Sequence, residues 1–268
     1  PLTWGAGKGF LAGTDTLTLN TASADSGTAS PTYAALHLTN AINLNSTVGT
    51  ISTTTANGRY HGAIQDFTSA VVTLTGNITD SGASGGIVKN GSGTLWLNPA
   101  IGNNTFAGTT TIAQGTLRAT DGVGLPINSN LNIRGQGAIA VFGSNGTVTR
   151  SLGTGAGQIR LGYVGSSGAG FSAIGGPLQV SIGGVGSETT LTAGGNLVAP
   201  LVLGNAGYAN NRVTLTNPIS VGAGVNQAVN TPAATGENSS DVGYDVPNRN
   251  YDSIISGQIS GGGTLTKT

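Results

Sequence analysis

The sequence predicts an all-β protein, specifically a right-handed parallel β-helix, or β-solenoid. Glycine makes up 47 of the 268 residues, and only 37% of residues belong to the hydrophobic set. Short runs that alternate Val, Ile, Leu or Thr with other residues recur between turns of Gly, Asn, Asp and Ser. No helical period is sustained for more than two turns. A compact globule of this composition would bury too little apolar surface to offset the ordering of its chain, whereas a thin stack of strands needs only a narrow core.

Disorder is the competing interpretation of so much glycine. Disordered chains have high charge and few β-branched residues. Here only 7% of residues are charged, and Val, Ile and Thr recur with period two. We therefore expect an ordered coil. At about 20–25 residues per turn, it would have about 11–13 turns and a length on the order of 55 Å.

Residues 85–120 carry the strongest pattern in the chain, because three short alternating runs at 93–97, 109–112 and 115–118 lie between glycine and asparagine turns. This stretch resembles the autotransporter-associated β-strand repeat, also called the passenger-associated transport repeat. Asn90 stands where the repeat usually has Thr, and Trp96 occupies a variable position. The positions that match the repeat are Lys89, Gly91, Gly93, Thr94, Leu95, Leu97, Asn104, Phe106, Gly108, Thr110, Ile112, Gly115, Thr116 and Leu117.

The resemblance implies a place in the cell and a role. Such repeats belong to passenger regions of bacterial autotransporters and similar giant proteins, which are secreted and displayed outside the cell or on its outer surface. There they are implied to assist secretion by folding on the outer surface, and to act as stalks, adhesins or fibres. The repeat itself carries no catalytic residue, so the resemblance transfers none.

The domain organisation predicted for residues 1–268 is one continuous solenoid segment of a longer repetitive protein. Residues 213–221 echo 36–44, and Lys267 stands at the place of Lys89 in a looser echo. We therefore expect about one and a half copies of a long-period repeat. Its parts are a first repeat region at 1–84, the autotransporter-type repeat at 85–120, connecting rungs at 121–190 and a partial second copy at 191–268.

One stretch interrupts this pattern, from Gln227 to Asn250, and it is predicted to protrude as a loop. Its acidic residues are weak candidates for a calcium site, because carboxylate oxygens are preferred ligands of that ion. Their spacing matches no calcium loop, and a solvated loop is favoured; no cofactor is predicted. The candidates are Glu237, Asp241, Asp245 and Asp252, the last lying just beyond the loop.

Catalysis is considered because β-helices also include polysaccharide lyases and hydrolases, whose sites need two nearby carboxylates or a carboxylate–calcium site beside a basic residue. Asp66 lies near Arg59 and His61, but a polar turn is the favoured interpretation. His37 has no second histidine or cysteine at metal-ligand spacing. We therefore predict no enzyme activity, no catalytic residue and no metal ligand set.

The aromatic residues are scattered through the sequence, and we expect core or cap positions for them rather than a sugar-stacking surface. The tryptophans and tyrosines are Trp4, Trp96, Tyr33, Tyr60, Tyr163, Tyr208, Tyr244 and Tyr251.

Charge and hydropathy limit the classes of partner that the chain can bind. The net charge is zero and there is no basic stripe, which disfavours nucleic acid. No apolar run approaches the length that a membrane-spanning helix needs, so no membrane span is predicted. The expected function is a structural or adhesive segment of an extracellular or cell-surface rod. Neighbouring repeats or further copies would meet it end to end, with host or neighbouring-cell surfaces and glycans as further candidate partners. The alternatives are a carbohydrate-binding or carbohydrate-cleaving β-helix, and a scaffold that carries another domain.

Overall fold

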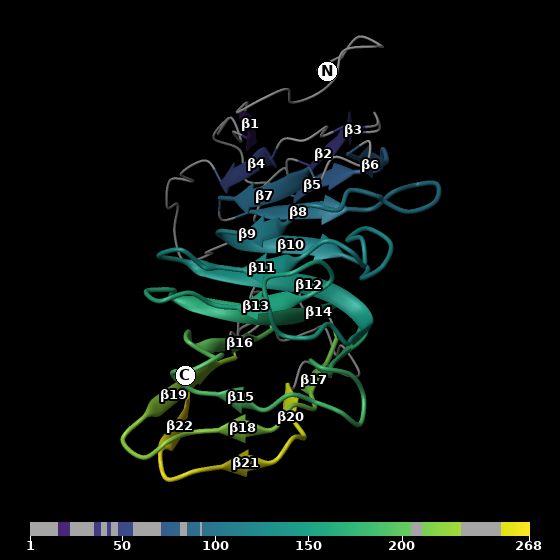
Figure 1. The fold of residues 1–268 in the computed structure, drawn as a ribbon. Helices are drawn as coiled ribbons and strands as arrows, with labels where there is room; N and C mark the ends of the chain where they lie inside the picture. The colour runs from purple at the N-terminus through teal and green to yellow at the C-terminus, as the bar shows by residue number, and fades with distance from the viewer. Residues whose placement is uncertain are drawn as a thin grey trace, which may run out of the picture.

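A computed structural model describes residues 16–21, 35–38, 42–43, 48–55, 71–80, 85–91, 93–204, 211–231 and 253–268, with side chains from residue 73 onward. Its strands stack one on another, from β1 near the top of Figure 1 to β21 and β22 at the bottom. Every strand pair among the described residues is parallel. The predicted all-β parallel β-helix is therefore confirmed.

Two long sheets form the main faces of the coil. The first follows the order β1 (Thr16–Thr21), β4 (Val48–Thr55), β7 (Gly86–Asn90), β9 (Thr110–Ile112), β11 (Leu131–Ile133) and β13 (Ile159–Leu161). The second follows the order β2 (Ala35–Leu38), β5 (Val71–Leu74), β8 (Thr94–Leu97), β10 (Gly115–Ala119), β12 (Ile139–Val148), β14 (Gly168–Val180), β16 (Leu201–Leu203), β19 (Asn226–Asn230) and β22 (Thr264–Lys267).

Shorter strands continue the coil beside these sheets. They are β3 (Ile42–Asn43), β6 (Ile78–Thr79), β15 (Leu191–Thr192), β17 (Val213–Leu215), β18 (Ile219–Ser220), β20 (Ile254–Ile255) and β21 (Ile259–Ser260). The long strand β14 turns a corner, because its first part pairs with β16 and its last part with β17. The neighbouring strand β12 bends with it, and the register between them shifts at Ser144–Gly146. Figure 1 shows both strands curving around one edge of the stack.

The core consists of inward side chains that repeat in register from turn to turn. In the second sheet one such column is Leu95, Leu117, Phe142, Phe171 and Leu203, each paired with the next along the stack. All five side chains are buried. The alternation of the sequence produces this column directly, because successive residues of a strand point to opposite faces. Burial of each such side chain contributes about 1.5–3 kcal/mol.

The spacing between turns is less regular than the sequence predicts. Thr110 pairs with Leu131 on the next turn, whereas Ile219 pairs with Ile259, across a stretch of chain roughly twice as long. The expected turn length holds around the repeat but is wrong elsewhere, because more residues separate the paired strands of the other turns. The longest path among the described strands has nine strands. At about 4.8 Å per step this path spans roughly 40 Å, so the described strands make fewer turns than the expected 11–13.

The start of the loop predicted at 227–250 is wrong. Its first four residues belong to β19, which pairs with β22. Gln227 is buried there, and its Nε2 donates to the carbonyl oxygen of Ala199 at 3.0 Å, while Val229 joins the core. The inward alternation therefore continues into this stretch. Residues 232–250 lie outside the described residues.

We predict that Leu117→Ala lowers the free energy of unfolding by about 2–5 kcal/mol, because it leaves a cavity between Leu95 and Phe142. Urea denaturation followed by circular dichroism measures this loss. Ile101→Ala is the matched control, since Ile101 is 82% exposed and its loss should change stability little. Equal effects of the two substitutions would contradict the assigned core.

Candidate functional site

Lys89 is a buried lysine in the core column of the first sheet. Its strand partners on following turns are Ile112 and then Ile133, both fully buried, and Lys89 itself has 0% exposure. A lysine among isoleucines needs hydrogen-bond partners for its ammonium group, because an unpaired buried charge is strongly unfavourable. Those partners lie at the end of the strand, where the chain turns.

Three backbone carbonyl oxygens accept hydrogen bonds from the Lys89 ammonium group. They belong to Asn90 at 2.9 Å, Gly91 at 2.6 Å and Gln114 at 2.9 Å. Gly91 has a φ of 78°, a left-handed conformation that glycine adopts without strain, and this turns its carbonyl toward the ammonium group. Gln114 comes from the next turn of the coil. Lys89 therefore ties one rung to the one that follows.

Asn104 makes a comparable connection across three turns. Its Oδ1 accepts a hydrogen bond from the backbone N–H of Ile78 at 2.8 Å, and its Nδ2 donates to the carbonyl oxygen of Gly124 at 2.7 Å. Asn217 makes a related connection to one turn only: its amide bonds both backbone groups of Ile182 and also donates to the carbonyl oxygen of Thr189 at 2.9 Å. Such buried amides satisfy backbone groups that the strand ladders leave free at corners.

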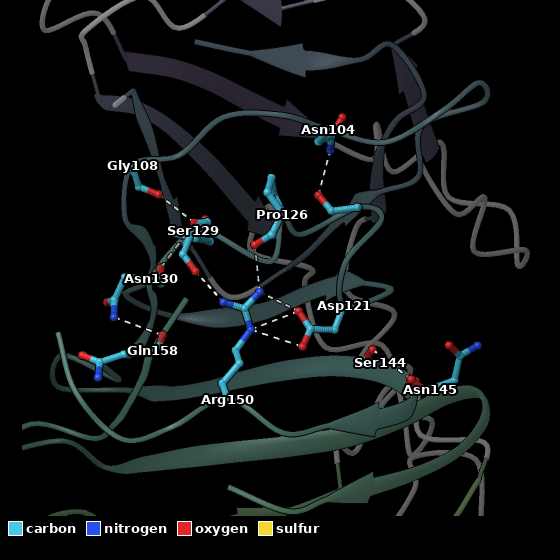
Figure 2. Close-up of polar contacts among 12 residues, drawn as sticks. Asn104, Gly108, Asp121, Pro126, Ser129, Asn130, Ser144, Asn145, Arg150 and Gln158 are labelled. Atoms are coloured by element: carbon cyan, nitrogen blue, oxygen red, sulfur yellow. Dashed lines mark hydrogen bonds and ion pairs between the residues drawn. The ribbon is translucent and has the colours of Figure 1, made fainter. Parts of the chain in front are cut away.

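Arg150 forms a buried ion pair with Asp121, shown in Figure 2. Its Nη2 lies 2.6 Å from Oδ1 of Asp121, and its Nε lies 3.0 and 3.2 Å from the two carboxylate oxygens. The guanidinium group also donates to the carbonyl oxygens of Pro126, at 2.8 Å, and Ser129. The side chains are 1% and 8% exposed. Both charges are paired, so this cluster fixes the chain between β10 and β11 against Arg150, which follows β12.

Two aromatic residues lie at the surface beside arginines. The guanidinium carbon of Arg118 stands 3.8 Å from the centre of the half-buried Trp96 ring. The ring of Tyr163, which is 41% exposed, has Arg134 at 4.9 Å and Arg160 at 5.2 Å. The expected core or cap position is therefore wrong for these two aromatic residues. The other tryptophan and the other five tyrosines of the sequence lie outside the described residues.

The predicted polar candidates fall largely outside the described part of the chain. The weak calcium candidates Glu237, Asp241, Asp245 and Asp252 lie outside it, as do Arg59, His61 and Asp66. His37 lies in β2, where only the backbone is described. Among the residues whose side chains are described, no three His, Cys, Asp or Glu residues come together as a metal site. The same part of the chain contains no helix long and apolar enough to cross a bilayer.

Sequence reasoning missed the arginines, although a signal for one of them was present. Trp96 and Arg118 occupy the same position in successive turns of the repeat, and they pair in register on adjacent strands. Because the two Gly-Thr-Leu runs pair in register, the outward residues that follow them, Trp96 and Arg118, lie side by side. Arg134 and Tyr163 lie in turns of unequal length, so no sequence period links them.

Comparison with known proteins identifies one segment. Residues 87–119 match the passenger-associated transport repeat, so the predicted repeat is confirmed. The matched residues run from β7 to the end of β10, and include Lys89 and Asn104. Neither a search of curated proteins nor a search of solved structures found a match to this chain. The repeat supports a passenger domain of the autotransporter type, a class of protein exported to the outer surface.

Lys89 gives a prediction about pH. Burial lowers its pKa from an ordinary 10.5 to about 7. Between these values the unfolded chain binds the proton and the folded chain does not, so stability rises with pH across this window, and this dependence ends below about pH 7. Lys89→Met should remove a slope of up to about 1.4 kcal/mol per pH unit. Urea denaturation at pH 7, 8, 9 and 10 compares the two proteins. An identical slope in both would contradict the buried, depressed lysine.

The ion pair gives a second prediction. Arg150→Met should destabilise the fold by about 3–5 kcal/mol, because it leaves the Asp121 carboxylate buried without its cation. Adding Asp121→Leu removes that charge and should restore part of the loss. Denaturation of the two single variants and the double variant measures the coupling. Additive losses would mean that the two side chains do not act as a pair.

Proposed function

We propose that this chain is a non-catalytic structural and adhesive segment of an autotransporter-type passenger, displayed outside the bacterial cell. The observation that carries the proposal is the passenger-associated transport repeat at 87–119, placed within a continuous parallel stack. Lys89 joins two rungs within the repeat, and Asn104 joins the repeat to the residues on either side of it. Each rung contacts mainly the rungs beside it, so a rod of this kind lengthens by repetition. That property suits a stalk or fibre.

Folding by successive rungs also suits secretion through a narrow passage. A rung that has emerged can pair with the rung before it, while the remainder of the chain is still unfolded inside. Lys89 and Asn104 support this proposal, because each bonds backbone groups of a neighbouring turn and so stabilises a newly added rung. The repeat would then drive export by holding the folded rungs outside.

The non-catalytic part of the proposal is supported by the acids whose positions are described. Asp121 is engaged by Arg150, and Asp80 is buried and accepts the backbone N–H of Ala107 at 2.7 Å. Glycoside hydrolysis requires two carboxyl groups that flank one bond. A carbohydrate-cleaving β-helix is therefore the weaker alternative. A carbohydrate-binding one is favoured by the exposed Tyr163 with its arginines.

Protease treatment of intact cells tests the location and the role of the repeat. We expect peptides from residues 87–119 to be released from intact cells of the encoding bacterium, while a cytosolic marker stays protected. Lys89→Met should lower the accessible fraction at constant total protein, because the rung loses its connection to Gln114. Arg118→Met is the control, since Arg118 is also a cation of the repeat but is partly exposed on β10.

Two results would contradict this proposal. Release of the peptides only after cell lysis would place the protein inside the cell and overturn the surface role. Equal export of the Lys89→Met and Arg118→Met variants would remove the role assigned to the Lys89 connection. The mass of the native polypeptide, measured in the same surface extract, tests the long rod, for which a value many times 26.2 kDa is expected.

A further inference from the structure

Tyr163, Arg134 and Arg160 gather on the outer side of the first sheet. Arg160 points outward from the middle of β13, and Arg134 follows β11 on the preceding rung. Tyr163 begins the loop after β13, and its ring lies within 5.2 Å of both guanidinium carbons. Two rungs and one loop therefore bring two positive charges to one exposed ring.

The loop that carries Tyr163 is fixed by its own hydrogen bonds. The backbone N–H of Tyr163 donates to Oγ of Ser166, and the N–H of Ser166 donates to the carbonyl oxygen of Tyr163, both at 2.9 Å. Ser166 Oγ donates in turn to the backbone carbonyl oxygen of Arg134. The loop that bears the ring is thus anchored to the rung that carries Arg134. Because the loop is already ordered, a ligand that binds there loses little free energy to ordering it, which favours affinity.

Neither arginine has a carboxylate partner within the described part of the chain, and Nε of Arg134 is buried there without a hydrogen-bond acceptor. An unsatisfied buried donor is unfavourable, and so are like charges held close together. An external anion would relieve the repulsion between the two guanidinium groups.

Polar side chains extend this surface along the rod. Thr111, Asn132 and Arg160 pair in register on β9, β11 and β13, and all three are outward positions that are at least partly exposed. Successive strands lie about 4.8 Å apart, so these side chains form a row of hydroxyl, amide and guanidinium groups. Such a row suits a ligand with many hydroxyl groups, and the guanidinium forks suit carboxylate or sulfate.

We propose that Tyr163, Arg134 and Arg160, with the row of Thr111 and Asn132, bind an acidic polysaccharide through its carboxylate or sulfate groups. The arginines contact the anionic groups, and the tyrosine ring provides an apolar and hydroxyl-bearing surface for the sugar between them. This inference rests on the proposed adhesive function and names the class of ligand for it.

Titration calorimetry with the full chain tests the proposal. The probes are an oligogalacturonate for the carboxylate source, a heparin oligosaccharide for the sulfate source, and neutral dextran. We expect binding to at least one acidic probe, none to dextran, and weakening as salt is raised. Arg134→Gln/Arg160→Gln should weaken binding by at least about tenfold, as expected for central arginines of an interface. Arg160→Lys should give an intermediate loss, because it keeps the charge but not the planar fork.

Arg118→Gln is the matched control, because Arg118 is also stacked on an aromatic ring but lies on the second sheet. Thermal unfolding of each variant checks folding; Ser166 bonds the backbone of Arg134, so the loop should survive the substitutions. Tyr163→Ala gives a second route to the same loss without any change of charge.

Three outcomes would overturn the inference. They are no binding to either acidic probe, equal weakening by Arg118→Gln, and equally tight binding of a poly-glutamate peptide, which would indicate a protein partner instead. Surface exposure is measured separately on intact cells. A chain that is displayed outside but binds neither polysaccharide would therefore refute this inference alone and leave the proposed export role in place.

Discussion

The structure depends on satisfying backbone groups at the corners of the coil. Along each strand the parallel ladder pairs the N–H and C=O groups, but at every turn the chain leaves the ladder while still facing the interior. Lys89, Asn104, Asn130 and Arg150 supply the missing partners with their side chains. Because these side chains reach the adjacent rung, the same bonds that complete one turn also position the next.

The need to satisfy backbone groups at the corners explains why charged side chains occur in the interior of the coil at all. Lys89 in its protonated form donates to three carbonyl oxygens, and the Arg150 guanidinium group bonds two carbonyl oxygens besides the Asp121 carboxylate. An apolar replacement at either position would leave several of these carbonyl groups without donors. The narrow core itself is built from single columns of Leu, Ile and Phe. Polar side chains at the corners therefore satisfy the backbone, and the apolar columns between them form the core.

The sequence predicts the strands well and the turns poorly, for a physical reason. Alternation places Leu117 and Phe142 in the core, since inward residues must be apolar on every rung. Turn length has no such constraint, so the expected constant spacing is wrong beyond the repeat, and β19 begins where a loop was expected. The Tyr163 surface escaped prediction because its residues come from turns of unequal length. Lys89 matched a repeat position, but its burial follows only from its place in a column of isoleucines.

The direction of the strand pairing has a mechanical consequence. The hydrogen bonds between rungs run along the axis of the stack, so a tensile force on the two ends pulls directly on each ladder instead of shearing it. Each interface between rungs then bears the full load in series, and the weakest would separate first. The connection from Lys89 to Gln114, together with the bridge through Asn104, reinforces the rungs of the repeat. Under such a load, rungs joined by these side-chain bonds would separate later than rungs joined by the backbone ladder alone.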